Sequence, residues 1–161
     1  MIDPLQLPKL AKQAESSNKK FFAVLKKKKP SNLDKVVHEL HEEVFAETDC
    51  LSCANCCKTT SPIFKQKDIE RLAPLFRLKP GDFIQKYLFM DEDGDYVHKG
   101  PPCPFLGQDN YCSVYEERPD ACRQYPHTDR KRFHEILNLT LKNTFVCPAA
   151  YEIVERMKQK L

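Results

Sequence analysis

Four of the eight cysteines in this 161-residue chain lie within eight consecutive residues. They are Cys50, Cys53, Cys56 and Cys57, so the window reads Cys-x-x-Cys-x-x-Cys-Cys. A disulfide needs two Cα atoms at a particular separation with converging Cβ vectors, and crowded or adjacent cysteines pair poorly with one another. A metal ion benefits from the same crowding, because a short loop brings several thiolates to one centre. The window therefore predicts metal coordination rather than disulfide bonds.

The other four cysteines, Cys103, Cys112, Cys122 and Cys147, are spread over the second half of the chain. A site that used all eight would join a tight loop to distant segments, so metal binding would help the domain to fold. Two of the four, Cys103 and Cys147, are followed by proline, and a Cys-Pro pair also closes the cysteine run of bacterial ferredoxins. We take all eight cysteines as candidate metal ligands.

Length and composition favour one compact domain with appendages, because 41% hydrophobic residues can supply a core. We find no apolar run of about 18 residues that could span a membrane, and the first residues lack the order of a secretory signal. We therefore expect a cytoplasmic protein, in which thiols stay reduced unless a metal binds them. The predicted division is an N-terminal helical segment over 1–49, a cysteine-cluster metal-binding domain over 50–148, and a C-terminal helix over 149–161 packing on the same domain.

The expected fold is mainly α, with irregular cysteine-rich loops organised by the metal and a short β-hairpin. Asp93-Gly94 is a good hairpin turn between Phe89-Met90 and Tyr96-Val97. Residues 133–141 fit either a helix or a strand by their apolar spacing, and we favour the helix. Apolar periodicity predicts further helices over 5–28, 33–44, 68–73, 80–88 and 148–161.

Further motifs surround the dispersed cysteines. They are Cys103-Pro104-Phe105-Leu106, an Arg-Pro-x-x-Cys-Arg-x-x-Pro block from Arg118 to Pro126, and Cys147-Pro148. With these motifs and the Cys-x-x-Cys-x-x-Cys-Cys window, residues 50–148 resemble the YkgJ-type cysteine-cluster family. That family is described as a zinc- or iron-chelating domain and is often labelled an iron-sulfur oxidoreductase, and flagellin lysine N-methylases carry a related module. All eight of its cysteines have counterparts here.

One residue departs from the family pattern. Asn55 stands where family members often have glycine. Asparagine is among the few other residues that tolerate a left-handed backbone, so we expect the turn and the metal site to survive.

The cofactor is expected to be an iron-sulfur cluster or zinc. Two tetrahedral zinc sites would use all eight thiols, whereas one four-iron four-sulfur (4Fe-4S) cluster needs four. The triple cysteine run and the Cys-Pro pairs favour the cluster over zinc by a small margin. Arg118 and Arg123 flank Cys122, where their guanidinium groups could donate hydrogen bonds around a negatively charged thiolate site. The alternative for these two arginines is surface pairing with the acidic residues of the same segment.

We therefore interpret the chain as a metal-binding protein with a redox or protein-modification accessory role, acting with a protein or redox partner. The alternative is a zinc-stabilised module that binds protein or nucleic acid without catalysis, supported by the basic run Lys26–Lys29. We read that run as a solvated helix end, so nucleic acid is not the expected partner, and we expect no membrane contact. No catalytic residue is assigned, because glycine-rich nucleotide loops and Gly-x-Ser-x-Gly elbows are missing.

Overall fold

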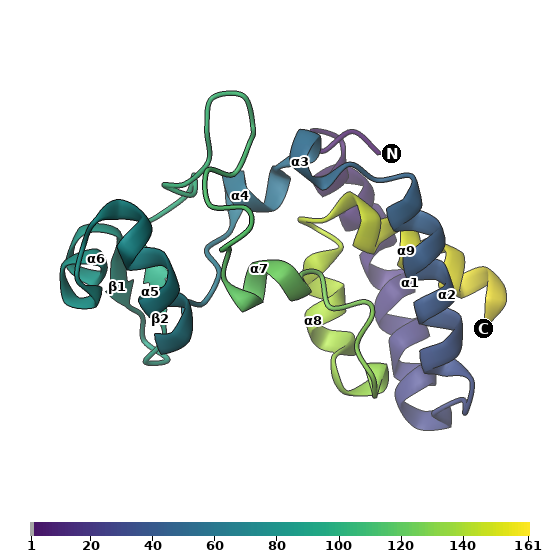
Figure 1. Ribbon diagram of the computed structural model, residues 1–161. Coiled ribbons are helices and arrows are strands. Elements are labelled where there is room, and N and C mark those ends of the chain that lie inside the picture. Colours follow the sequence, from purple (N-terminus) through teal and green to yellow (C-terminus); the bar gives the residue numbers. More distant parts are fainter. Residues whose placement is uncertain (1) are drawn as a thin grey trace. The chain divides into compact units, whose positions relative to one another are not determined.

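The computed structural model describes residues 2–161 and is mainly α-helical, which confirms the predicted fold class (Figure 1). Its contacts divide the chain into two compact units. Unit 1 contains Met1–Asp49 and Pro126–Leu161, and unit 2 contains Cys50–Tyr125. We predicted a domain over 50–148 because this range holds the candidate metal ligands, whereas the two units are defined by contacts within the chain. The metal-binding domain therefore stays a prediction.

Unit 1 is a group of helices around an aliphatic core. Helix α2 packs along α9, and α1 contacts both α8 and α9. The two longest helices bury one face each, because their apolar residues recur at helical spacing. The elements are α1 (Leu7–Lys28), α2 (Leu33–Ala46), the 3-10 helix η2 (Phe133–Glu135), α8 (Leu137–Asn143) and α9 (Pro148–Lys160).

The junction between α1 and α2 is a short turn over residues 29–32. Helix α1 ends at Lys28; its C-cap, Lys29, has a left-handed backbone (φ 44°), and Pro30 follows. Asn32 stands at the N-cap of α2 but makes no capping hydrogen bond. The carboxylate of Asp34, in the first turn of α2, instead accepts hydrogen bonds from the backbone N–H groups of Arg132 (2.7 Å) and Phe133 (2.9 Å). Asp34 therefore fixes the loop before η2 onto the start of α2.

Residues 133–143 are helical, as we favoured, but the helix is broken. Ile136 separates η2 from α8 with φ −108° and ψ 13°. Phe133, Ile136 and Leu137 are all buried in the unit 1 core. Leu139, which completed the alternation of Leu137, Leu139 and Leu141 that also fitted a strand, is 39% exposed, so that alternation does not mark a buried face.

Unit 2 begins with the cysteine window and continues through short helices to the hairpin. The hairpin prediction is confirmed, with Phe89 opposite Val97 and Met90 opposite Tyr96. Gly94 has φ 82°, as such a turn requires. The elements are α3 (Cys50–Cys53), α4 (Asn55–Thr59), α5 (Gln66–Leu72), η1 (Ala73–Phe76), α6 (Pro80–Tyr87), β1 (Leu88–Met90), β2 (Tyr96–His98) and α7 (Asp120–Gln124).

An aromatic cluster forms the centre of the unit 2 core. The ring of Phe105 lies with its centroid 5.3 Å from Phe76, 5.2 Å from Tyr87 and 5.9 Å from Phe83, with which it stacks. Aromatic pairs at such separations contribute beyond their buried area. Phe105 follows Cys103 by two residues, so the same core that holds unit 2 together also positions that cysteine.

No helix among residues 2–161 combines the length and the apolar character that crossing a bilayer requires.

Candidate metal centre

The cysteine window folds into two short helices joined at a left-handed residue. Cys50 and Cys53 begin and end α3, and Cys56 and Cys57 lie in α4. Ala54 between them has φ 46° and donates its N–H to the carbonyl of Cys50 at 2.9 Å. The left-handed position is therefore Ala54 and not Asn55, whose backbone is already helical. Replacing the family's glycine by asparagine thus places no strained residue at position 55.

Cys57 and Cys103 are joined through the backbone. The N–H of Cys103 donates to the carbonyl of Cys57 at 2.7 Å. This bond connects the end of the cysteine window to the Cys-Pro-Phe-Leu motif, which is 46 positions later in the chain. Two of the cysteine segments named in the sequence are therefore adjacent.

Four thiols of unit 2 are close enough to influence one another's charge. Burial raises the pKa of Cys122 to about 12, and the negative charges of Cys57, Cys103 and Cys112 add to that increase. Burial also raises the pKa of Cys103 to about 11, with contributions from the charges of Cys57 and Cys112. The pKa of Cys112 is raised by burial and by the charge of Cys57. We call Cys57, Cys103, Cys112 and Cys122 the four-thiol group.

Cys57 is the member of this group that ionises most readily. A hydrogen bond from the Cys56 thiol lowers the pKa of Cys57 to about 7, against the opposing effect of burial. The positive charge of Lys58 adds to the decrease. A thiolate is the form that binds metals, so Cys57 is the member best prepared to make the first bond.

Backbone amides are directed at several of the sulfur atoms. The N–H groups of Phe105 and Leu106 stabilise the Cys103 thiolate, and that of Val114 stabilises the Cys112 thiolate. In unit 1, the N–H of Ala150 donates to the Sγ of Cys147 at 3.4 Å, at the start of α9. Amide donors to sulfur disperse the charge of a thiolate and are one of the means by which proteins tune thiolate metal sites.

A tight loop carries Cys103 and Cys112. Leu106 pairs with Cys112 across an isolated antiparallel bridge, and the N–H of Gly107 donates to the carbonyl of Tyr111 at 2.8 Å. A Cβ at Gly107 would stand 2.6 Å from Oδ1 of Asp109 and 3.2 Å from the Tyr111 carbonyl. The loop therefore needs glycine at this position for space.

Arg118 lies near the four-thiol group. Its positive charge lowers the pKa of Cys112 and of Cys122, opposing the larger effect of burial. The guanidinium lies 3.9 Å from the ring centroid of Tyr115 and donates to the Tyr115 carbonyl at 2.5 Å. Arg118 is thus held beside the thiols by its own loop.

Arg123 uses its guanidinium on backbone carbonyls, those of Glu116 and of Arg118, the second at 3.2 Å. Within residues 2–161, neither Arg118 nor Arg123 forms an ion pair with a carboxylate. Their predicted role around the metal ligands stays a prediction.

An ion pair that the sequence did not reveal, between partly exposed Arg71 and buried Asp68, positions this loop. Asp68 in α5 is fully buried and accepts a 2.8 Å bond from Arg71. Arg71 also donates to the carbonyl of Arg118 at 3.0 Å, and the N–H of Asp120 donates to Asp68 at 3.1 Å. The pair therefore holds the segment that carries Arg118 and Cys122. The one sign of this ion pair in the sequence was an acidic residue, Asp68, in the first turn of the helix predicted over 68–73.

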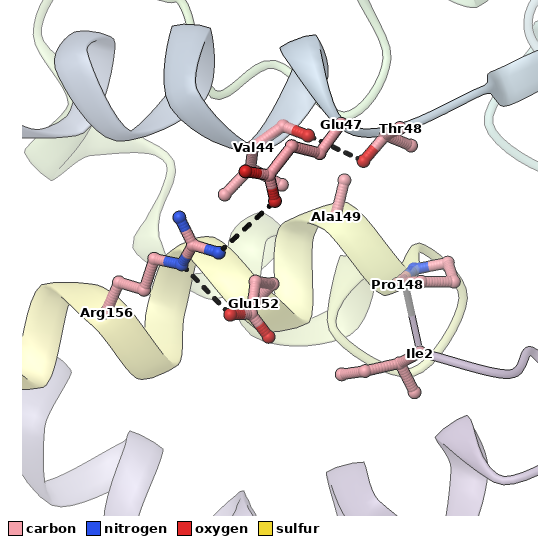
Figure 2. Close-up of a pocket in the computed structure, with 8 residues that line it drawn as sticks. All are labelled: Ile2, Val44, Glu47, Thr48, Pro148, Ala149, Glu152 and Arg156. Atoms are coloured by element: carbon pink, nitrogen blue, oxygen red, sulfur yellow. Dashed lines mark hydrogen bonds and ion pairs between the residues drawn. The ribbon is translucent and has the colours of Figure 1, made fainter.

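Unit 1 contains a pocket of about 300 Å³ between the end of α2 and the start of α9 (Figure 2). Arg156 lies in it and pairs with Glu152 at 2.9 Å and with Glu47 at 3.9 Å. Because this cation is already balanced by carboxylates, we assign the pocket no ligand.

The thiols do not form a finished coordination site. Among residues 2–161, no three histidine, cysteine or acidic side chains are arranged so that they could hold a metal ion as they stand. The donor chemistry nevertheless fits a thiophilic metal, because four half-buried thiols interact and receive amide or guanidinium support. Binding would have to draw the sulfur atoms together, which couples metal binding to local folding. Ligand roles for Cys50, Cys53, Cys56 and Cys147 stay a prediction.

A family model named CxxCxxCC, with the description "putative zinc- or iron-chelating domain", matches residues 49–145. No curated protein and no solved structure matches the chain.

Proposed function

This chain belongs to the CxxCxxCC family, and from that membership we propose that it binds a metal centre through Cys57, Cys103, Cys112 and Cys122. The observation that carries the proposal is the joining of three cysteine segments: the N–H of Cys103 donates to the carbonyl of Cys57 at 2.7 Å, and Leu106 of the Cys-Pro-Phe-Leu motif pairs with Cys112. The effect of the four thiols on one another's ionisation agrees with this geometry and includes Cys122. The four thiols therefore lie in one small region of unit 2, although they come from four separate parts of its sequence. A tetrahedral zinc ion or a 4Fe-4S cluster each requires four thiolates from one such region.

The metal we propose is iron, in an iron-sulfur cluster, with zinc as the alternative. Within the four-thiol group, the Cys-Pro pair at Cys103 supports the cluster. The Cys-x-x-Cys-x-x-Cys run lies outside this group and supports the cluster through the further proposed ligands Cys50, Cys53 and Cys56. When bound, such a cluster supplies one-electron transfer, whereas zinc at a site of four cysteines supplies only structural stability. If the metal is an iron-sulfur cluster, we propose a redox or protein-modification accessory role, carried out with a protein or redox partner. A cytoplasmic location would keep the thiols reduced and available.

The chain's own residues have distinct tasks in this proposal. Cys57 ionises first, because Cys56 and Lys58 lower its pKa. Amides of Phe105 and Leu106 then offset the charge that collects on Cys103. Arg118 does the same for Cys112 and Cys122 by its positive charge. The other four cysteines, Cys50, Cys53, Cys56 and Cys147, are further proposed ligands.

The test is to purify the full chain without oxygen and to measure iron, zinc and acid-labile sulfide per chain. Iron and sulfide in equal amounts, with an absorption shoulder near 400 nm that reduction removes, would support the cluster. Zinc without sulfide would support the structural site. Less than stoichiometric amounts of both metals, in protein that remains folded and is offered each metal under reducing conditions, would overturn the proposal.

A further inference from the structure

Two basic segments that are far apart in the sequence lie together at one end of unit 1. The first is Lys26–Lys29, at the end of α1, and the second is Arg130–Arg132, in the loop before η2. Both line the same hollow of about 210 Å³, to which they contribute Lys29 and Arg132, and His134 lies on it as well. We call these seven residues and His134 the basic end; Figure 1 shows the turn between α1 and α2 where it lies.

Specific contacts hold the two segments in this arrangement. The Nζ of Lys26 donates to Oδ1 of Asn138 in α8 at 2.8 Å. A ring nitrogen of His38 in α2 lies 3.2 Å from the carbonyl of Arg130. The carboxylate of Asp34 accepts the backbone N–H groups of Arg132 and Phe133. The convergence is therefore built into the packing of unit 1 rather than produced by flexible side chains.

Most of the positive charge at the basic end is uncompensated. Arg132 pairs with Glu135 at 2.5 Å, and Asp34 is engaged by backbone amides. Among residues 2–161, Lys27, Lys28, Lys29, Arg130 and Lys131 form no ion pair, and all five are exposed. Elsewhere on α1, by contrast, Lys12 and Lys19 both pair with Glu15. A concentration of unpaired cations on one rigid surface is the electrostatic footprint of a polyanion site.

We propose that the basic end binds the phosphate backbone of nucleic acid, independently of base sequence. Lysine and arginine from two sides of a hollow can contact successive phosphates of one strand. Among residues 2–161, the large aromatic residues with the highest exposure, Phe89 and Tyr111, both belong to unit 2, so the basic end has no exposed phenylalanine or tyrosine for base stacking. Two aliphatic side chains close to it in the sequence are exposed, Val24 at 46% and Leu139 at 39%, so a membrane surface is the competing occupant that the test below must distinguish. We read Lys26–Lys29 from the sequence as a solvated helix end and did not expect nucleic acid, because the sequence does not show that Arg130–Arg132 lies beside that run.

This inference does not depend on the metal proposal, because every residue of the basic end belongs to unit 1 and none is a cysteine. A result against either proposal therefore leaves the other standing. A Cys122→Ser chain should lose metal and still bind nucleic acid.

The experiment measures binding of the full chain, as purified with its metal, to a fluorescein-labelled DNA duplex and to an RNA duplex of mixed sequence. The double variants K27Q/K28Q and R130Q/K131Q should each weaken binding roughly tenfold and reduce the slope of log affinity against log salt by about 2. The control K9Q/K20Q removes the same charge from exposed lysines elsewhere on α1 and should change affinity less than twofold. Circular dichroism and a melting curve establish that each variant is folded.

Two results would overturn the proposal. One is affinity for the duplexes that does not change with salt or that falls equally in K9Q/K20Q. The other is that the chain binds neither duplex but does bind vesicles containing phosphatidylserine, which would make the basic end a membrane-surface site instead.

Discussion

The backbone N–H of Cys103 donates a 2.7 Å hydrogen bond to the carbonyl of Cys57, which fixes the Cys-Pro motif against the cysteine window. Because Phe105 then enters the aromatic core, the position of Cys103 is determined from both sides. The proposed metal site is therefore supported by packing and hydrogen bonding that do not depend on a metal.

Replacing Cys103 by serine should remove the metal of the four-thiol group. Serine keeps the shape and the backbone bond to Cys57 but is a poor ligand for soft metals. We expect at least a severalfold decrease in metal per chain after anaerobic purification, with near-native helical content. Tyr111→Ser is the matched control, because Tyr111 lies in the same loop, is 57% exposed and has no thiol. Unchanged metal content in Cys103→Ser would exclude Cys103 as a ligand.

The two glycines of unit 2 that can be compared directly should respond to alanine with opposite signs. Gly107→Ala places a Cβ against Asp109, whose Oδ1 also accepts the N–H of Tyr111, and against a backbone carbonyl. We expect a loss of about 1 kcal/mol in the free energy of unfolding and weaker metal retention.

Gly81, the glycine for comparison, lies in α6, and a Cβ added there would have nothing within 4 Å. Gly81→Ala should therefore stabilise by about 0.5 kcal/mol, because alanine is the better helix former. Denaturant unfolding measures both, and equal effects would refute the steric argument.

Asn18 should be replaceable by leucine with a gain in stability. It lies in α1, is fully buried, and within residues 2–161 neither its side-chain oxygen nor its nitrogen has a hydrogen-bond partner. A buried polar group without a partner costs about 1 to 3 kcal/mol. We expect Asn18→Leu, which keeps the number and branching of the side-chain heavy atoms, to raise the free energy of unfolding by about 1 kcal/mol. Asn18→Asp, which buries a charge at the same position, should lower it; a lower melting temperature in both variants would contradict the prediction.

The stability of unit 1 should depend on the ionisation of Asp34. Burial alone would raise the pKa of this carboxyl, but the hydrogen bonds from Phe133 and Arg132 outweigh it and the pKa is lowered from 3.8. A lowered folded-state pKa contributes stability that is present above about pH 4 and is lost as the pH falls through the folded value. Asp34→Ala should cost about 1 kcal/mol at pH 7, and less at pH 3.

Denaturant unfolding at the two pH values measures this difference. Glu39→Ala is the control, because Glu39 is exposed and its one ion pair within residues 2–161 is with Lys35 at 3.9 Å. A cost of Asp34→Ala that is the same at both pH values would show that the charge of the carboxylate is not what stabilises the loop.

Local sequence patterns predicted the fold well where one segment decides the outcome. Apolar periodicity identified α2 and α9, and Asp93-Gly94 identified the hairpin, because helix faces and tight turns are specified within a few residues. The contacts that position the candidate sites were not predictable in this way. Asp68 is tied to Asp120, 52 positions later, and the two basic segments are about a hundred residues apart. Neither pairing leaves a periodic signal, so both became visible only in the folded chain.

Metal binding to the four-thiol group should release protons and should strengthen as the pH rises. Burial raises the pKa of Cys103 to about 11 and that of Cys122 to about 12, and it also raises the pKa of Cys112, so these thiols are protonated at neutral pH in the metal-free protein. Cys57, with a pKa of about 7, is partly ionised there. Each protonated thiol that becomes a ligand must lose its proton, so we expect roughly three to four protons released per metal near pH 7. The apparent affinity should therefore rise steeply between pH 6 and 8, because protons compete with the metal for the same sulfur atoms.

Titration calorimetry with zinc in buffers of different ionisation enthalpy measures directly how many protons are released per metal bound. Release of one proton or none would mean that these buried thiols are not the ligands.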